Sequence, residues 1–298
     1  MALTQQQKDE LMAGLAAGDA RKAQMVKERV IPESYKAWMQ EVDREETVLT
    51  VPDCEVPVRV IINRAKHKKP DCPIHINCHG GGFVTPQNQD DDLYCAHVAA
   101  GIRGIVVDID YAVLPDHPFP IAFNQVWGVI AWVFEQAESW GADRKHISLG
   151  GNSAGGCLVT AAALKNGKTK DFSFELLIPQ YAANDNYMAV LPDGNPRSRI
   201  FSLLYAEGDE ELLKDPYVSP AFAPDEDLAA MPRTLFIAAQ NCPFTPVNDA
   251  LAMRMAAQGV LVGMKRYLNS NHGFLVRMGG DEWPAAQQLV IDSINELQ

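Results

Sequence analysis

The chain has 298 residues, enough for one large α/β domain or two modest ones. Hydrophobic residues make up 47% and charged residues 21%, which excludes a disordered or low-complexity protein. The 38 acidic residues outnumber the 26 basic ones and give a net charge of −12. An acidic chain repels phosphate backbones and anionic lipids, so we expect neither a nucleic-acid nor a membrane partner.

The amino terminus and the cysteines bear on location and chemistry. Residues 1–22 lack the apolar core of a signal peptide, and no run approaches the roughly 18 apolar residues that cross a bilayer. The six cysteines have neither metal-ligand spacing nor the pattern of a disulfide framework. The sequence therefore predicts a cytoplasmic protein with no metal site.

The first forty residues have a helical pattern. Apolar side chains recur at helical spacing at Leu11, Leu15, Met25, Val26 and Val30, and Pro32 separates a second helical piece over 33–40. From Thr47 onward, short β-rich runs alternate with helical stretches. The pattern predicts N-terminal helices followed by an α/β fold.

Eight runs have the composition of strands. They cover 47–51, 58–62, 74–77, 105–109, 147–150, 174–178, 234–239 and 262–268. The first two flank a short polar turn, which favours an antiparallel start. The middle runs are almost wholly apolar and alternate with helical segments such as 121–137 and 247–258, so both faces of the sheet are covered and most strands are parallel. The prediction is an α/β-hydrolase fold, with a mostly parallel eight-stranded sheet flanked by helices.

The stretch over 182–213 interrupts this alternation. It is rich in Asn, Asp, Gly, Pro and Tyr and then offers a short helical run over 198–205. A loop of this length in a compact domain usually carries function. We expect a single α/β-hydrolase domain over 1–298, with an N-terminal helical cap segment over 1–45 and a cap or lid insertion over 182–213.

A candidate nucleophile lies in the sequence Gly-Asn-Ser-Ala-Gly over 151–155. A predicted strand precedes this G-x-S-x-G pattern and a helical run, 157–165, follows it. A sharp strand-to-helix turn pushes the Ser153 hydroxyl out at the end of the strand, and the glycines permit the strained backbone. The helix N-terminus also directs backbone N–H groups toward developing negative charge.

A second motif, His-Gly-Gly-Gly over 79–82, follows the third predicted strand. Successive glycines let the main chain turn its N–H groups toward one point, as an oxyanion hole requires. A phosphate-binding loop is disfavoured, because neither the G-K-[ST] ending nor the G-x-G-x-x-G spacing is present. Together the two motifs indicate acyl transfer.

These motifs resemble the hormone-sensitive-lipase-like family of α/β-hydrolase carboxylesterases. Further matches are Asp-Tyr-Ala-Val-Leu-Pro-Asp-His-Pro-Phe-Pro over 110–120, Tyr-Val-Ser-Pro over 217–220 and Asn-Ser-Asn-His-Gly-Phe over 269–274. The similarity extends from about Thr47 to the C-terminus. It departs from the family pattern at Ala112, where the family has Arg, and at Asn152, where it commonly has Asp; both departures concern local packing.

The resemblance implies a lipase-like serine carboxylesterase that hydrolyses short-chain acyl esters of small molecules without a cofactor. By motif position, Ser153 is the nucleophile and His272 the general base and acid. Gly81, Gly82 and Ala154 would supply the N–H groups of the oxyanion hole. The oligomeric state cannot be read from the sequence, and a homo-oligomer is compatible with it.

The third member of the expected triad is missing. The family places an acid in an aspartate-Pro-Leu context after the seventh strand, and here Cys242 holds that place before Pro243. A neutral thiol cannot stabilise the protonated imidazole as a carboxylate does. Asp249 in the next helix or Asp185 after the sixth strand could substitute, or Asn241 could orient a neutral imidazole. Otherwise the protein is a weak hydrolase.

The acidic run Asp90-Asp91-Asp92 admits two interpretations. It could recognise a cationic substrate, because it follows the glycine loop, but carboxylates favour a helix N-terminus and we expect a helix to start there.

The sequence favours a serine carboxylesterase. Two alternatives remain: a catalytically inactive binding protein, suggested by Cys242, and a small-molecule deacetylase or amidase, which the same machinery permits.

Overall fold

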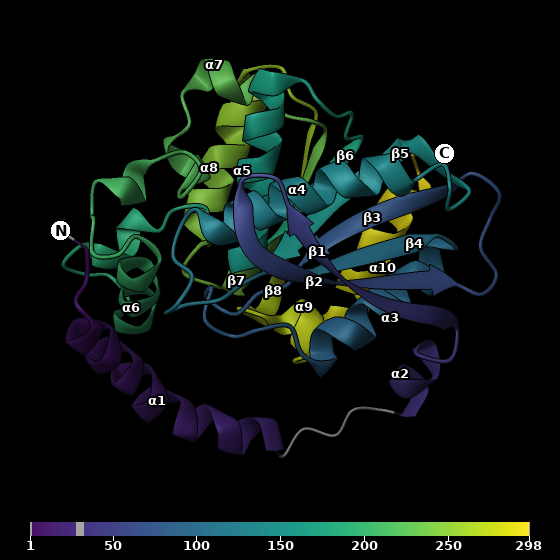
Figure 1. Ribbon diagram of the computed structural model, residues 1–298. Helices are drawn as coiled ribbons and strands as arrows, with labels where there is room; N and C mark the ends of the chain where they lie inside the picture. Colours follow the sequence, from purple (N-terminus) through teal and green to yellow (C-terminus); the bar gives the residue numbers. More distant parts are fainter. Residues whose placement is uncertain (1, 28–32, 298) are drawn as a thin grey trace.

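The protein is built on a central eight-stranded sheet. The computed structural model describes residues 2–27 and 33–297, and its strand order is β1-β2-β4-β3-β5-β6-β7-β8 (Figure 1). β1 and β2 pair antiparallel, β2 and β4 also pair antiparallel, and the remaining neighbours are parallel. The strands are β1 Val42–Val51, β2 Cys54–Ala65, β3 Cys72–Cys78, β4 Ile105–Asp110, β5 Ala142–Asn152, β6 Leu176–Gln180, β7 Thr234–Asn241 and β8 Val262–Asn271.

Helices cover both faces of this sheet. One face carries α4 (Ile121–Gln136), α5 (Ala154–Thr169) and α8 (Thr245–Ala257), and the other carries α3 (Gln89–Ile102), α9 (Phe274–Arg277) and α10 (Trp283–Asn295) (Figure 1). Successive β4 side chains divide between two cores. Val107 and Ile109 join the first core, and Val106 joins the second. This division explains the continuous apolar runs, because both sides of a central strand are buried.

The fold confirms the predicted α/β-hydrolase sheet, while the strand ends differ from those predicted. β5 starts at Ala142, ahead of the predicted apolar run. Its first residues include some with exposed side chains, such as Arg144, which belong to the strand but contribute nothing to the core, so the apolar pattern does not reveal them. β6 begins at Leu176, two residues later than predicted. β1 begins at Val42, so the predicted helical cap segment over 1–45 is wrong for its last four residues, which belong to the sheet.

Some of the remaining helices pack on one another near the carboxyl ends of the parallel strands, beside the cavity that contains Ser153. α6 (Pro196–Tyr205) contacts α1 (Gln5–Lys27) and the short helix η1 (Tyr187–Val190) (Figure 1). The other short helices are α2 Glu33–Trp38, η2 Leu212–Lys214, η3 Pro220–Phe222 and α7 Asp225–Leu228. Val30, predicted to be helical, and Pro32, predicted to separate two helical pieces, lie outside the described residues. The division into a domain, an N-terminal cap and an insertion stays a prediction.

The first turn of α6 has a clear sequence cause. The Asn195 side chain accepts hydrogen bonds from the N–H groups of Arg197 and Ser198, and Pro196 occupies the first helical position. The helix therefore begins two residues before the predicted run over 198–205.

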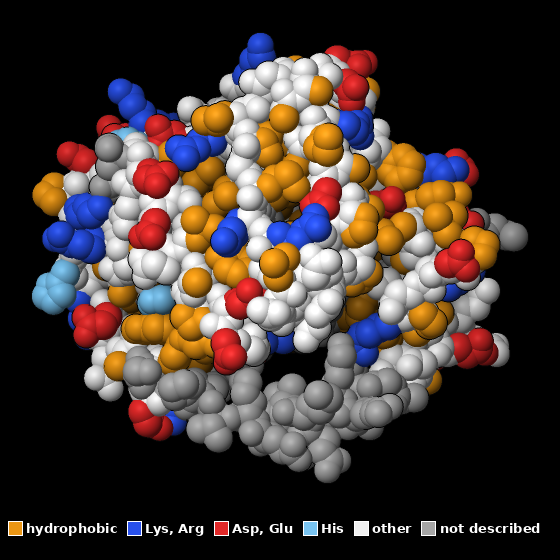
Figure 2. All heavy atoms as spheres, turned by 180° about the vertical axis from the view of Figure 1, so that it is seen from behind, with side chains coloured by type: hydrophobic (Ala, Val, Ile, Leu, Met, Phe, Trp, Pro, Cys, Tyr) orange, Lys and Arg blue, Asp and Glu red, His pale blue; other side chains and the backbone are white. Residues whose placement is uncertain are grey.

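The surface shows no large region of one charge in the view from behind. Acidic and basic side chains lie interspersed there, with hydrophobic side chains between them (Figure 2). Among residues 2–27 and 33–297, every helix is too short or too polar to traverse a bilayer.

Candidate active site

Ser153 lies on a strained turn between β5 and α5. Its φ of 55° and ψ of −114° fall in a region that L-residues rarely adopt. The Ser153 N–H donates to the carbonyl of Gln180 at 3.0 Å, which fixes the turn to the end of β6. A Cβ at Gly155 would lie 2.0 Å from the carbonyl oxygen of Cys78, so only glycine lets α5 approach β3 this closely. The predicted nucleophile turn has the expected geometry.

His272 follows β8 and points at Ser153. Its Nε2 lies 2.9 Å from Ser153 Oγ. The rings of Tyr181 and Phe244 pack edge-on against the imidazole, with centroids at 5.1 and 5.5 Å. The structure thus brings together the predicted nucleophile and base at hydrogen-bonding distance.

Cys242 occupies the other side of the imidazole. It follows β7, and its Sγ lies 3.1 Å from His272 Nδ1. Burial raises the pKa of the thiol to about 11, against a weaker opposing effect of the backbone N–H groups of Phe244 and Thr245. The thiol is therefore neutral near pH 7.

The other acid candidates have partners of their own. Asp249 on α8 forms an ion pair with Arg266 of β8. Asp185 accepts a hydrogen bond from the Met188 N–H at 2.9 Å, and burial raises the pKa of its carboxyl. Asn241, the proposed neutral orienter, pairs with Asn271 across the β7–β8 ladder. The sulfur of Cys242 is thus the group placed at Nδ1, where a triad acid would lie.

The predicted oxyanion residues border the same cavity as Ser153 and His272. Gly81, Gly82 and Ala154 line it, and its volume is about 190 Å³. Gly81 has a φ of 130° and Gly82 a φ of 64°, conformations that favour glycine. Ala154 is the first residue of α5, so its N–H belongs to the unpaired amino end of that helix.

A Gly82→Ala substitution is expected to lower kcat/KM for ester hydrolysis by about 10²–10³. Its Cβ would lie 2.5 Å from the ring of Phe201, and the positive φ would be strained. Adding Phe201→Ala to Gly82→Ala is expected to restore part of this loss. The same addition is expected to restore nothing in Gly81→Ala, whose Cβ would meet the Thr85 backbone oxygen at 2.6 Å. Wild-type kinetics in Gly82→Ala would contradict the assignment.

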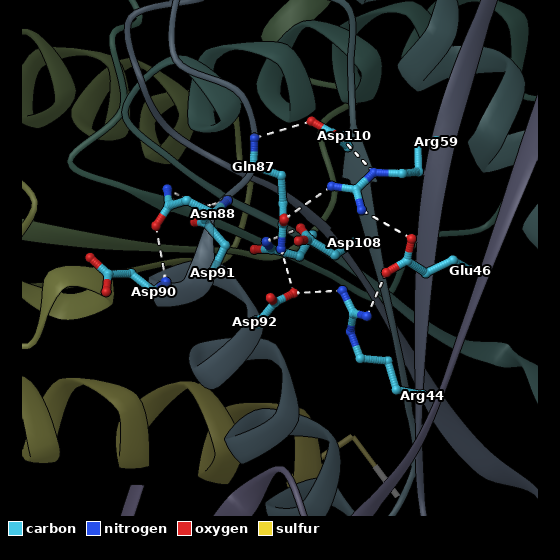
Figure 3. Close-up of polar contacts among 11 residues, drawn as sticks. Arg44, Glu46, Arg59, Gln87, Asn88, Asp90, Asp91, Asp92, Asp108 and Asp110 are labelled. Carbon is cyan, nitrogen blue, oxygen red and sulfur yellow. Dashed lines mark hydrogen bonds and ion pairs between the residues drawn. The ribbon is translucent and has the colours of Figure 1, made fainter. Parts of the chain in front are cut away.

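A network of polar side chains contacts His79, the first residue of the glycine loop, and Figure 3 shows its members Asp110, Arg59 and Gln87. Asp110 accepts hydrogen bonds from Arg59 Nε at 2.9 Å and from the Gln87 N–H at 3.1 Å, and its Oδ1 lies 3.6 Å from Nε2 of the buried His79. Tyr111 stacks on the His79 ring and donates its hydroxyl to the His79 carbonyl at 2.9 Å. The Asp-Tyr pair of the matched motif therefore fixes the residue that opens the loop.

Two further carboxyls in this network are almost fully buried. Desolvation raises the pKa of Asp91 to about 7 and that of Asp108 to about 6. Asp91 accepts hydrogen bonds from the backbone N–H and side-chain amide of Asn88, and Asp108 accepts one from Asn77 at 2.7 Å. Asp91 and Asn88 form the capping box of α3, as expected from the helix-start interpretation of the acidic run (Figure 3).

The free energy of unfolding is expected to fall as pH rises from about 4 to about 7. The folded protein holds protons on Asp91 and Asp108 that the unfolded chain releases near 3.8, and the carboxylates around His79 also raise its pKa despite its burial. All three groups therefore contribute stability that is lost as they deprotonate. Urea unfolding at several pH values should show a shallower slope in Asp108→Asn, with the exposed Asp171→Asn as the control. A free energy of unfolding that rises with pH between about 4 and about 7 would refute the prediction.

The fold and the site place this chain in a known class. Residues 75–276 match the model of the alpha/beta hydrolase fold family, and the chain belongs to that family. It is 31% identical over 221 residues to esterase LipI of Mycobacterium tuberculosis, covering 69% of this chain and 66% of that protein. It is 27% identical over 299 residues to carboxylic ester hydrolase LipN of the same organism, covering 93% of this chain and 77% of LipN.

A comparison with solved structures agrees with the α/β-hydrolase fold. The esterase of Pyrobaculum calidifontis superposes with a TM-score of 0.78 at 23% identity, covering 100% of this chain and 99% of that one. Together with the sequence matches, this confirms the predicted resemblance and the predicted enzyme class, the carboxylic ester hydrolases.

Sequence reasoning missed several residues of the site. Phe201 packs against Gly82, Phe244 packs against His272, and Arg197 and Arg277 line the cavity. The capping pattern at Asn195 could have located the start of α6, on which Arg197 and Phe201 lie. No local sequence pattern marks Phe244 or Arg277, because their places in the site depend on which loops meet at the edge of the sheet.

Proposed function

We propose that this protein hydrolyses carboxylic esters of small molecules by a serine mechanism through an acyl-enzyme. The observation that carries the proposal is the 2.9 Å contact between His272 Nε2 and Ser153 Oγ on a strained turn. The glycine loop borders the same cavity and supports the assignment of an oxyanion hole.

In acylation, Ser153 Oγ attacks the ester carbonyl while His272 Nε2 takes the hydroxyl proton. The resulting oxyanion accepts hydrogen bonds from the N–H groups of Gly81, Gly82 and Ala154. Collapse of the tetrahedral intermediate breaks the C–O bond to the alcohol, and the imidazolium returns the proton to that oxygen.

In deacylation, His272 takes a proton from water, whose oxygen attacks the acyl carbonyl. The bond to Ser153 Oγ breaks, the proton returns to Ser153, and the carboxylic acid leaves. In both half-reactions the imidazolium faces the neutral thiol of Cys242 across 3.1 Å. A neutral thiol supplies none of the negative charge that a carboxylate in this place would supply, and we expect slow turnover for an enzyme of this class.

A short acyl chain fits the cavity best. Its volume of about 190 Å³ lies below the roughly 300–1,000 Å³ of pockets that hold drug-sized ligands. The rings of Phe83 and Phe201 border the cavity beside the glycine loop.

The neutral thiol of Cys242 also favours a second candidate, a binding protein that keeps the pocket without turnover. A fluorophosphonate probe distinguishes the two, because it reacts only with an activated serine. The proposal expects stoichiometric labelling of Ser153 and slower labelling in His272→Ala. No labelling of folded protein would favour the binding protein.

The acyl preference and the bond type need their own measurement. We expect kcat/KM to be highest for p-nitrophenyl acetate and butyrate and to fall for the decanoate. Turnover of p-nitroacetanilide should be far slower than that of p-nitrophenyl acetate, whereas comparable rates would favour an amidase or deacetylase.

A further inference from the structure

A second cavity adjoins the cavity of the proposed active site. Its volume is about 660 Å³, and its lining comes from the segment over 188–198 and from the two residues that precede α8. Five residues border both cavities: Ala189, Asn195, Ser198, Pro243 and Phe244. The two cavities therefore meet at these residues, and a molecule bound at Ser153 can extend from one into the other.

The second cavity is lined mostly by apolar side chains. They are Met188, Leu191, Pro192, Pro196, Pro243 and Phe244. Leu191 is 43% exposed, which makes it one of the large hydrophobic side chains that the fold leaves open to solvent. Among the described lining residues the ionisable side chain is that of Asp193, which is exposed. An apolar hollow beside a reactive serine is suited to an uncharged apolar group.

The part of this cavity that comes from residues 188–198 is held by hydrogen bonds within the chain. The Gly194 N–H donates to the Leu191 carbonyl at 2.9 Å, which closes the turn before α6. Arg199 Nη1 donates to the Val190 carbonyl at 2.8 Å and so ties α6 to η1. Because these contacts fix the turn, binding a group against Leu191 would cost little ordering of the chain.

Phe244 links the second cavity to the proposed chemistry. Its ring packs against the His272 imidazole with centroids at 5.5 Å, and it borders both cavities. Pockets that hold drug-sized ligands measure roughly 300–1,000 Å³. The cavity of Ser153, at about 190 Å³, is smaller than this range, whereas the second cavity lies within it. A substrate that extends across Phe244 therefore has room for a large group.

Resting on the proposed ester hydrolysis, we propose that the substrate is an ester whose alcohol part carries a large, uncharged apolar group, and that this group binds in the second cavity. The short acyl chain proposed above occupies the cavity of Ser153, which leaves the alcohol as the part that needs further room. The cleaved bond and the acyl-enzyme are those already described. What the inference adds is the size and polarity of the leaving alcohol.

Two isomeric esters test the size and the place of the apolar group. 4-Benzylphenyl acetate carries a benzyl group on the alcohol part of phenyl acetate, and phenyl 3-phenylpropanoate carries the same group on the acyl part. We expect kcat/KM for 4-benzylphenyl acetate to exceed that for phenyl acetate by about 10- to 100-fold, because the benzyl group leaves water. The acyl isomer should show no such gain. A ratio of one or less for 4-benzylphenyl acetate, or an equal or larger gain for the acyl isomer, would overturn the proposal.

A charge placed in the second cavity tests where the benzyl group binds. Leu191→Glu should lower the ratio of 4-benzylphenyl acetate to phenyl acetate by at least about 5-fold, because the bound ring would desolvate the new carboxylate. Leu191→Ala should lower the ratio less. Leu261→Glu is the matched control, since Leu261 is also an exposed leucine (67%) and lies just before β8, at the amino ends of the parallel strands. It should leave the ratio unchanged. A ratio that Leu191→Glu preserves would overturn the proposal.

A binding measurement separates this proposal from the proposed function. If no ester is hydrolysed, the proposed function fails on its own, and the second cavity is then tested in Ser153→Ala. Calorimetry should show tighter binding of 4-benzylphenol than of phenol, and adding Leu191→Glu should reduce the difference. Equal binding of the two phenols, or a difference that Leu191→Glu leaves intact, would contradict the assignment of the cavity.

Discussion

A Cys242→Asp variant is expected to hydrolyse p-nitrophenyl acetate with a kcat about 10²–10⁴ above that of the wild-type protein. The sulfur lies 3.1 Å from His272 Nδ1, and a carboxylate there would stabilise the imidazolium of both half-reactions. Loss of the triad carboxylate in a serine protease costs about 10⁴ in turnover, which sets the upper limit of the gain. The backbone N–H of Phe244, which lowers the pKa of the thiol, would also favour the charged form of the carboxylate.

Cys242→Asn is the matched control. It has nearly the shape of aspartate without the charge, so we expect it to stay within a few-fold of wild type. Equal rates in both variants would show that another group stabilises the imidazolium. Comparing both variants with Asp185→Asn and Asp249→Asn would then identify that group.

Ser153→Ala is expected to reduce ester turnover by at least about 10³, close to the uncatalysed rate. The hydroxyl is the nucleophile of the proposed mechanism, and the oxyanion groups alone give only residual catalysis. Stopped assays with p-nitrophenyl butyrate measure the loss, and an unchanged melting temperature shows that the fold is intact.

The Ser148→Ala variant controls for loss of a hydroxyl, because Ser148 lies in β5, the strand that leads to Ser153. Ser148 is buried in β5 beside His75, away from the cavity. We expect it to change stability more than catalysis. Wild-type turnover in Ser153→Ala would require a different nucleophile.

The sheet could be predicted because burial on both faces leaves apolar runs that periodicity detects. Residues 74–77 and 105–109 lie within β3 and β4 as expected. Strand ends such as Ala142 and Val42 could not be predicted, because residues there pair through the backbone while their neighbours' side chains stay in solvent. The order of the strands was not readable either, since a single sequence does not encode which strands become neighbours.

The residues of the site likewise divide into those that the sequence predicted and those that it did not. Ser153, His272 and the glycine loop lie in motifs whose spacing follows from local backbone geometry, so sequence could single them out. The proximity of Cys242 to the imidazole was expected only from the position of the family's acid. The packing of Phe201 on Gly82 depends on how α6 meets the glycine loop, and no local pattern encodes that contact.

The most direct test is acid-quenched peptide mapping of the protein mixed with p-nitrophenyl acetate. Slow deacylation with a poorly stabilised imidazolium should leave a measurable fraction of chains carrying one acetyl group on Ser153, and Ser153→Ala should carry none. An acetyl group on Cys242 or on another residue, with Ser153 unmodified throughout turnover, would contradict the serine mechanism.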